Sequence, residues 1–89
     1  MSAIYEVVLH AQARRELDKV PRDLFPKIDA AIWELRENAR PFGVKKLEGD
    51  LHRIRVGNWR IIYAVFDRDK RIVILHVVRR TERTYKKLH

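Results

Sequence analysis

The sequence predicts an α+β domain, a compact β-α-α-β-β-β arrangement in which a helical hairpin packs on a mainly antiparallel four-stranded sheet. Three observations support this fold: a strand-like pattern at the start, two helical patterns in the middle, and three strand-like patterns at the end, separated by short turns. Eighty-nine residues provide one core of helices on a sheet but not two. We therefore expect a single domain over residues 1–89.

The first two elements follow each other directly. β-Branched and aromatic residues predict a strand over Ala3–His10. Apolar residues then recur at helical spacing over Ala11–Val20, and Pro21 interrupts the pattern. This change of period from two to about 3.6 indicates a strand that leads straight into a short helix.

A second and longer helical pattern occupies the segment before residue 41. Leu24, Ile28 and Leu35 lie on one apolar stripe, for which Asp23 is the expected N-cap and Pro41 the expected stop. The two helices form a hairpin whose apolar stripes must be buried against another element. Only the second half of the chain supplies a sheet to cover them.

That second half begins with a loop over Pro41–Asp50, which contains two glycines and a proline. The two residues "GN" and the four residues "DRDK" then separate three strand patterns, and both are good hairpin connections. The predicted strands are Leu51–Val56, Trp59–Phe66 and Arg71–Val78.

The first hairpin fixes an unusual pairing. With Gly57 and Asn58 as the two turn residues, Arg55 lies opposite Arg60. Residues in this position have Cβ atoms about 4.5–5.5 Å apart, where like charges are destabilising unless an anion is accommodated. The same register pairs Arg53 with Ile62.

The second hairpin assigns the remaining residues to the two sheet faces. Carrying the register across "DRDK" pairs Ile62 with Leu75 and Arg60 with Val77. The face predicted to receive the helices carries Ile54, Val56, Trp59, Ile61, Tyr63, Val65, Ile72, Ile74, His76 and Val78. The opposite face is predicted to gather Arg53, Arg55, Arg60 and Arg79 at one end and Leu51, Ile62, Ala64, Phe66, Val73 and Leu75 at the other.

Overall charge points to the class of partner. Twenty Lys and Arg residues against twelve Asp and Glu residues give a formal net charge of +8. This excess favours polyanions such as RNA, DNA or an acidic protein segment, and a basic surface kept for solubility is the alternative. No apolar run reaches the roughly 20 residues that span a membrane, and no secretory signal pattern is present. With no cysteine, we expect a cytoplasmic protein without disulfides.

The predicted arginine face is a candidate phosphodiester site. Guanidinium groups bind phosphate oxygens bidentately and keep their charge at every relevant pH. Tyr85, in the basic tail, is placed to stack on a base, and a solvated tail anchored by this tyrosine is the alternative. Strand arginines that only blunt a sheet edge or pair with carboxylates are the alternative for the face as a whole.

Other chemistry has little support in the sequence. The four histidines, His10, His52, His76 and His89, show no metal-ligand spacing, so we expect no metal site. The chain has no glycine-rich phosphate loop, no serine nucleophile motif and no paired carboxylates at the arginine face. We expect no cofactor, and an active site that works mainly through positive charge.

The pattern resembles the RelE/ParE superfamily of toxins from prokaryotic type II toxin–antitoxin systems, and within it the RelE-like members. The resemblance runs from "YEVVLHAQARRELDKVP" through "RRTERTY", and "KLEGDLHRIRVGNWRIIYAV" is its most specific part. It implies a ribosome-dependent endoribonuclease that cuts mRNA in the A site, with the 2′-hydroxyl of the preceding ribose attacking the phosphate. The residues matched to the family's catalytic positions are Arg53, Arg55, Arg60, Arg79 (or Arg80 if the register moves) and Tyr85.

Further basic residues are candidates for RNA binding: Lys45, Lys46, Arg80, Arg83, Lys86 and Lys87. Many RelE-like toxins carry lysines where this chain has Arg53 and Arg55, and one of those lysines is proposed as a general base. Arginine is a poor proton acceptor, so catalysis here is expected to rest on positioning and electrostatics.

The resemblance also implies partners. A cognate antitoxin is expected to fold an acidic segment over the toxin, forming a hetero-oligomeric complex, and the ribosome and mRNA are the expected targets. The alternative is a ParE-like inhibitor of DNA gyrase without nuclease activity, and a nontoxic RNA-binding module or a degenerate toxin is a third reading. The ordered arginines favour the nuclease, because an inhibitor needs no phosphate site.

Overall fold

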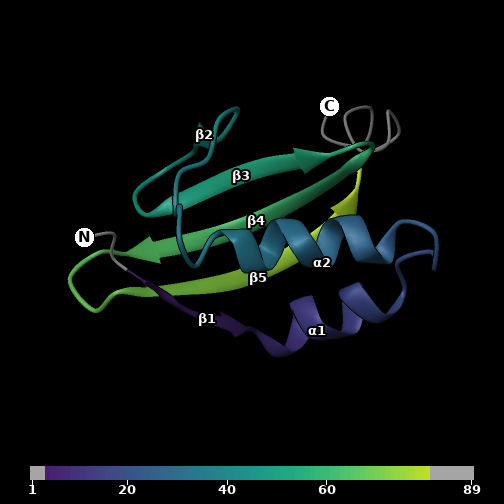
Figure 1. The fold of residues 1–89 in the computed structure, drawn as a ribbon, viewed down its shortest axis with the longest axis horizontal. Helices are drawn as coiled ribbons and strands as arrows, with labels where there is room; N and C mark the ends of the chain where they lie inside the picture. The colour runs from purple at the N-terminus through teal and green to yellow at the C-terminus, as the bar shows by residue number, and fades with distance from the viewer. Residues whose placement is uncertain (1–3, 81–89) are drawn as a thin grey trace.

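The computed structural model describes residues 4–80, which form two helices on one face of a mixed sheet (Figure 1). The strand order across the sheet is β1-β5-β4-β3-β2. β1 pairs in parallel with β5, and the other three pairs are antiparallel. The elements are β1 (Glu6–Leu9), α1 (Ala11–Asp18), α2 (Phe25–Glu34), β2 (Lys45–Lys46), β3 (Leu51–Val56), β4 (Trp59–Phe66) and β5 (Arg71–Arg79).

The predicted α+β class and the mainly antiparallel sheet are confirmed, but the sheet has five strands instead of four. The fifth is β2, which lies in the segment predicted to be a loop and pairs Lys45 with Arg53 and Lys46 with His52. Two lysines have neither the apolar alternation nor the β-branching that marks a strand in a sequence. Their strand conformation comes from pairing with β3.

α1 begins where predicted, after His10, whose Nδ1 accepts the backbone N–H of Gln12 at 3.2 Å. α2 begins later than predicted, because residues 21–24 form a turn first and Leu24 is the N-cap. Asp23 as the cap was therefore wrong. α2 also ends at Glu34, well before Pro41. Beyond it, the carbonyls of Arg36 and Ala39 accept hydrogen bonds from Tyr5 N–H and the Tyr63 hydroxyl instead of continuing the helix.

The β3–β4 register is the predicted one, from Val56 opposite Trp59 through Arg55 opposite Arg60. The β4–β5 register is as predicted only near the turn, where Phe66 pairs with Arg71. Between Ile62 and Tyr63 the ladder shifts, since Tyr63 pairs with Ile74 but Ile62 pairs with His76. One extra residue of β5 is accommodated here, which is a β-bulge.

The bulge changes which β5 residues face the helices. Val77 is buried in the core, whereas His76 and Val78, predicted to face it, do not belong to the core. The remaining predicted core residues lie on the helix-facing side, where α2 crosses in front of β4 and β5 in Figure 1. The buried cluster is Ala13, Leu17, Val20, Ile28, Ile32, Leu35, Ala39, Ile54, Ile61, Tyr63, Val65, Ile72, Ile74 and Val77.

A polar cluster joins the residue before β1, the segment after α2 and the β4–β5 turn. Arg40 donates two hydrogen bonds to Asp67, of 3.2 and 2.9 Å, and the Tyr5 hydroxyl donates a third of 2.6 Å. These donors, Arg40 foremost, lower the pKa of Asp67 to about 2. No helix within residues 4–80 is long and apolar enough to cross a membrane.

Candidate functional site

The candidate site is the sheet face turned away from the helices, and two cross-strand rows of residues build it. Directly opposite residues of paired strands share a face. The first row, from β2 to β5, is Lys45, Arg53, Ile62 and His76. The second row, nearer the β3–β4 turn, is Arg55, Arg60 and Val78. We call the basic residue types of these rows, Lys45, Arg53, Arg55, Arg60 and His76, the basic face.

Three of the predicted catalytic residues are brought together on this face. Arg55 lies directly opposite Arg60, and Arg53 lies two residues before Arg55 on the same side of β3. Arg53 and Arg60 are half-buried and Arg55 is exposed. Guanidinium groups on one face favour an anion, because a phosphate between them offsets their like charge and accepts paired hydrogen bonds. The arrangement is suited to binding a phosphodiester.

The two lysines of β2 lie on opposite sides of the sheet. Lys45 is opposite Arg53 and extends the basic face toward the sheet edge, whereas Lys46 is opposite His52, which points into the helix-facing side. Both lysines are exposed. Of the two, Lys45 is therefore the one that shares a face with the arginines.

The bulge removes Arg79 from the group in which it was predicted. Arg79 pairs with Trp59, one residue along β4 from Arg60 and hence on the opposite side of the strand. It lines a cavity of about 300 Å³ together with Trp59, Asp23 and Leu24, next to the turn between the helices. The predicted register, with Val77 opposite Arg60, was wrong by one residue, and Arg79 lies on the helix side as a result.

Arg80 takes the position predicted for Arg79. Its backbone N–H donates to the Asn58 carbonyl at 2.6 Å, which continues the β4–β5 pairing one step beyond Arg79. Because sides alternate along a strand, Arg80 falls on the side of Val78, next to the second row. The remaining predicted residues, Tyr85, Arg83, Lys86 and Lys87, lie outside the described residues.

His76 is the site residue that sequence reasoning assigned to the wrong face. The bulge puts it in the first row, and its side chain is half exposed. Its Nδ1 lies 3.4 Å from Glu16 Oε1 of α1, and the same oxygen accepts the Val77 N–H at 2.9 Å. Since a carboxylate only accepts hydrogen bonds, this contact favours a proton on Nδ1 and leaves Nε2 as the acceptor of the ring.

Under the basic face, a buried pair fixes β3 against β4. His52 is 2% exposed and its ring stacks on Tyr63 with the centroids 5.5 Å apart. Its Nδ1 donates to the Asp50 carbonyl at 2.8 Å, and the Tyr63 hydroxyl donates to the Ala39 carbonyl at 2.9 Å. Burial raises the pKa of Tyr63 to about 12, so this hydroxyl keeps its proton at any physiological pH.

The other end of the same sheet face is apolar. Val73 and Leu75 are half-buried there, and Phe66 is 38% exposed. Ile62, expected in this group, lies in the first row between Arg53 and His76. Ala64, expected in this group, is buried. Among residues 4–80 there is no group of three or more His, Asp or Glu side chains arranged to hold a metal ion.

Comparisons with known proteins identify the family of this chain. Residues 7–84 match the family model described as the ParE toxin of type II toxin–antitoxin systems. The chain is 36% identical over 85 residues to the toxin RelE of Mycobacterium tuberculosis, covering 86% of this chain and 82% of that protein. This match shows similarity across most of the domain.

Two solved structures share the fold. The archaeal RelE–RelB complex from Pyrococcus horikoshii gives a TM-score of 0.81 at 34% identity, covering 89% of this chain and 98% of that one. The toxin–antitoxin complex RelBE2 from Mycobacterium tuberculosis gives 0.76 at 26% identity, with 88% and 100% covered. The chain is therefore a toxin of a type II toxin–antitoxin system and belongs to the RelE/ParE superfamily.

Proposed function

We propose that this toxin is a ribosome-dependent endoribonuclease that cuts mRNA in the A site and so inhibits translation in the cytoplasm. The observation that carries the proposal is the pairing of Arg55 with Arg60 across the β3–β4 hairpin, with Arg53 beside them. Three guanidinium groups on one face are suited to binding a phosphodiester. Membership of the RelE/ParE superfamily points to RNA as the molecule that contains it.

In the proposed reaction, the 2′-hydroxyl oxygen of one ribose attacks the adjacent phosphorus and the bond to the 5′-oxygen of the next nucleotide breaks. The products are a 2′,3′-cyclic phosphate and a 5′-hydroxyl, so the 2′-proton is lost and the leaving oxygen gains one. Charge builds on the phosphorane oxygens, where Arg53, Arg55 and Arg60 stabilise it. Catalysis also requires the attacking oxygen to be held in line with the leaving one.

We propose His76 as the acceptor of the 2′-proton. Arginine keeps its proton at every relevant pH, whereas an imidazole accepts one near neutrality. The contact with Glu16 supports this role because it orients the ring and stabilises the imidazolium that forms. His76 lies on the same face as Arg53, with Ile62 between them in the first row. It is two residues before Val78, which pairs with Arg60.

The proposed partner is a cognate antitoxin, as in the RelE–RelB complexes of similar fold. A chain of net charge +8 favours an acidic antitoxin segment. We propose that toxin and antitoxin form a hetero-oligomer that keeps mRNA and ribosome away from the basic face.

A second candidate function is inhibition of DNA gyrase without RNA cleavage. The specific observation in its favour is that the matching family model is that of the ParE toxin. The basic face favours the nuclease, because binding to a protein target requires no group that stabilises a phosphorane.

Cleavage mapping on programmed ribosomes tests the proposal. We expect cuts within the A-site codon for the wild type, and their loss in Arg60→Ala and in an Arg53/Arg55 double alanine. Folded wild-type protein that makes no ribosome-dependent cut would contradict the nuclease, and inhibition of gyrase supercoiling by the same sample would then support the second candidate.

A further inference from the structure

A cavity of about 300 Å³ lies on the helix-facing side of the sheet, at the tip of the β3–β4 hairpin. The turn between the two helices and the ends of β4 and β5 supply its walls, through Pro21, Asp23, Leu24, Asn58, Trp59 and Arg79. We call it the Trp59 cavity. Its volume lies at the lower end of the range of about 300–1,000 Å³ that small-molecule sites occupy.

The Trp59 cavity brings a cation, an anion and an aromatic ring together. Trp59 is half-buried and lies directly opposite Arg79 in the β4–β5 pair, so the Cβ atoms of the two residues are about 4.5–5.5 Å apart. Asp23 and Arg79 are both exposed, and within residues 4–80 neither forms an ion pair, a side-chain hydrogen bond or a ring contact. Both charges are therefore available to a ligand.

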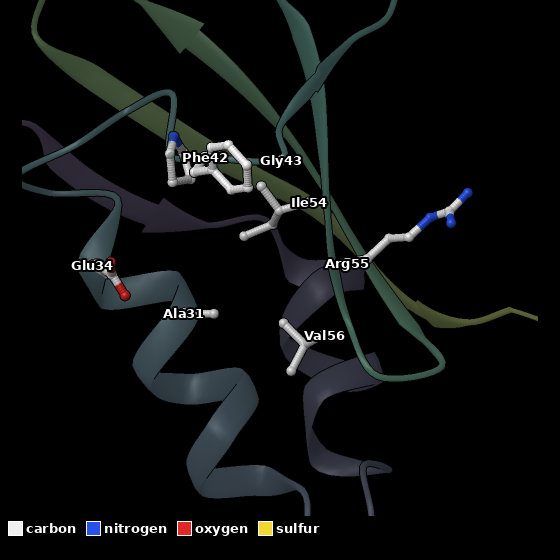
Figure 2. A pocket seen from close by; sticks show the side chains of 8 residues that line it. Ala31, Glu34, Phe42, Gly43, Ile54, Arg55 and Val56 are labelled. Atoms are coloured by element: carbon white, nitrogen blue, oxygen red, sulfur yellow. The ribbon is translucent and has the colours of Figure 1, made fainter.

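A second cavity, of about 320 Å³ between α2 and β3, differs from it in charge. In Figure 2, Ile54 and Val56 point from the strand toward α2, whereas Arg55 points to the other side of the strand. Among the described residues that line this second cavity, Glu34 is the only carboxylate and Arg55 the only cation. Since that cation points away, the second cavity is not suited to a phosphate, and the Trp59 cavity is the better anion site of the two.

Arg79 and Trp59 together match the two ends of a mononucleotide. A guanidinium group binds phosphate oxygens through paired N–H donors. Every nucleobase has a π face that stacks on an indole ring, and Pro21 and Leu24 add apolar surface to the same cavity. Because Arg79 and Trp59 are cross-strand neighbours, a base on the indole lies next to a phosphate on the guanidinium.

Asp23 selects among the bases. An ionised carboxylate only accepts hydrogen bonds, and its two oxygens accept side by side. Guanine presents two adjacent donor groups, the ring N1–H and the 2-amino group, whereas adenine, cytosine and uracil each present a single donor group on this edge. The exposed amide of Asn58 has an N–H₂ group, which is the matching donor for guanine O6. Guanine is therefore the base that uses the polar groups of the cavity most fully.

The guanine comes either from a free nucleotide or from an RNA chain. Trp59 and Arg79 are one residue from Arg60 and Arg80, but sides alternate along a strand, so the cavity and the basic face lie on opposite sides of the sheet. RNA bound at the basic face would have to pass around the end of the sheet to enter the cavity. This separation favours a free nucleotide.

We propose that the Trp59 cavity binds a free guanine mononucleotide, with the base on Trp59, its N1–H and 2-amino group on Asp23, and its phosphate on Arg79. This site is separate from the basic face and does not depend on the nuclease activity proposed there. The cavity joins the turn between the helices to the hairpin that carries Arg55 and Arg60, so a bound nucleotide is expected to raise the Tm of the toxin.

A nuclear magnetic resonance titration of the full toxin with guanosine 5′-monophosphate tests this inference. The chain has two tryptophans, Trp33 and Trp59, and a Trp33→Phe variant assigns their indole N–H signals. We expect the Trp59 signal to shift with a dissociation constant below about 1 mM. The Trp33 signal should stay in place, because Trp33 is exposed on α2 and does not line the cavity.

Related nucleotides test which groups of guanine are recognised. Inosine 5′-monophosphate differs from the guanine nucleotide only by the absence of the 2-amino group. This nucleotide and adenosine 5′-monophosphate are expected to bind roughly tenfold more weakly, because each leaves an oxygen of Asp23 without its donor. Guanosine, which has no phosphate, is expected to bind about tenfold more weakly as well.

Toxin variants assign each part of the nucleotide to a residue. Asp23→Asn is expected to weaken guanosine 5′-monophosphate by about tenfold and the adenine nucleotide by less than about twofold. Arg79→Ala is expected to weaken guanosine 5′-monophosphate by about tenfold and guanosine by less than about twofold. Arg68→Ala, which removes an exposed arginine in the β4–β5 turn, is the charge-matched control and should change each affinity by less than about twofold. Circular dichroism checks that each variant is folded.

Three outcomes would overturn the inference: no shift of the Trp59 signal at millimolar nucleotide, equal affinities for the guanine and adenine nucleotides, or an unchanged affinity in Arg79→Ala. Ribosome-dependent cleavage by the same variants separates the two sources of guanine. If Arg79→Ala loses as much cleavage as Arg80→Ala, the guanine belongs to the RNA and the free-nucleotide site fails. Binding is measured without ribosomes, so a toxin that binds the nucleotide and cuts no mRNA contradicts the nuclease alone.

Discussion

Arg60 and Ile61 are neighbours on β4, yet they belong to different parts of the molecule. Ile61 is fully buried against the helices, whereas Arg60 lies on the open face opposite Arg55. The first removes apolar surface from water, and the second brings two like charges together. The comparison teaches that the helix-facing side of the sheet holds the fold, whereas the opposite side carries the candidate site.

The largest effect expected from this comparison is on the helix-facing side. Ile61→Ala removes a fully buried side chain and leaves a cavity, which is expected to lower the free energy of unfolding by about 3–5 kcal/mol. Urea denaturation followed by circular dichroism measures the loss. A decrease below about 1 kcal/mol would show that Ile61 is not a central part of the core.

The basic face should respond in the opposite way. Arg60→Ala is expected to reduce ribosome-dependent cleavage by about 100- to 1000-fold, since it removes a donor to the developing phosphorane charge. The variant should keep the wild-type fold by circular dichroism, because Arg60 is not part of the buried core. Arg68→Ala is the control, with the same change of charge at an exposed turn. An Arg60→Ala variant that cleaves at the wild-type rate would break the comparison.

His76 allows the proposed proton transfer to be tested. His76→Gln is expected to lower single-turnover cleavage by about 10- to 100-fold, with little change in mRNA or ribosome binding. Arg68→Ala, an exposed substitution in the β4–β5 turn, is the control and should leave the rate unchanged. A His76→Gln variant that cleaves at the wild-type rate would remove His76 from the mechanism.

Arg79 and Arg80 are adjacent residues on opposite sides of β5, so they form a second matched pair. Arg80→Ala is expected to lower cleavage by roughly tenfold or more, through loss of a charged contact to the RNA. Arg79→Ala is expected to change it by less than about threefold, because Arg79 lies beside Trp59 on the helix side. Equal losses in the two variants would mean that RNA reaches both sides of the strand.

These pairs show what the sequence predicts well. The β3–β4 register was predicted residue by residue because a two-residue turn at Gly57 and Asn58 leaves no freedom in the pairing. The pairing of Arg55 with Arg60, which defines the candidate site, follows from that turn alone. Gly57 has φ of +59°, as such a turn requires.

The β4–β5 pair shows where the prediction fails. A bulge in the middle of a strand is not marked by turn residues in the sequence, and Leu75 and His76 are ordinary strand-forming residues. The only signal of the bulge was indirect. The predicted register buried the polar His76 and exposed the apolar Val77, and one extra residue in β5 reverses the two. The site's candidate proton acceptor was missed for this reason. Lys45 was among the RNA-binding candidates, but its place opposite Arg53 was not predicted, because a two-residue polar strand carries no pattern.

The smallest expected effect concerns the cluster that closes the far end of the sheet. Arg40 and Tyr5 donate to Asp67 and lower its pKa to about 2, below the ordinary value of 3.8. A carboxylate with a depressed pKa in the folded state stabilises the fold above pH 4 and loses that contribution as the pH falls toward 2. Because the group is exposed, Asp67→Asn should lower Tm at pH 7 by a few degrees at most. The difference from wild type should vanish near pH 2, and a difference that persists there would mean that hydrogen-bond geometry, and not the charge of Asp67, holds the cluster together.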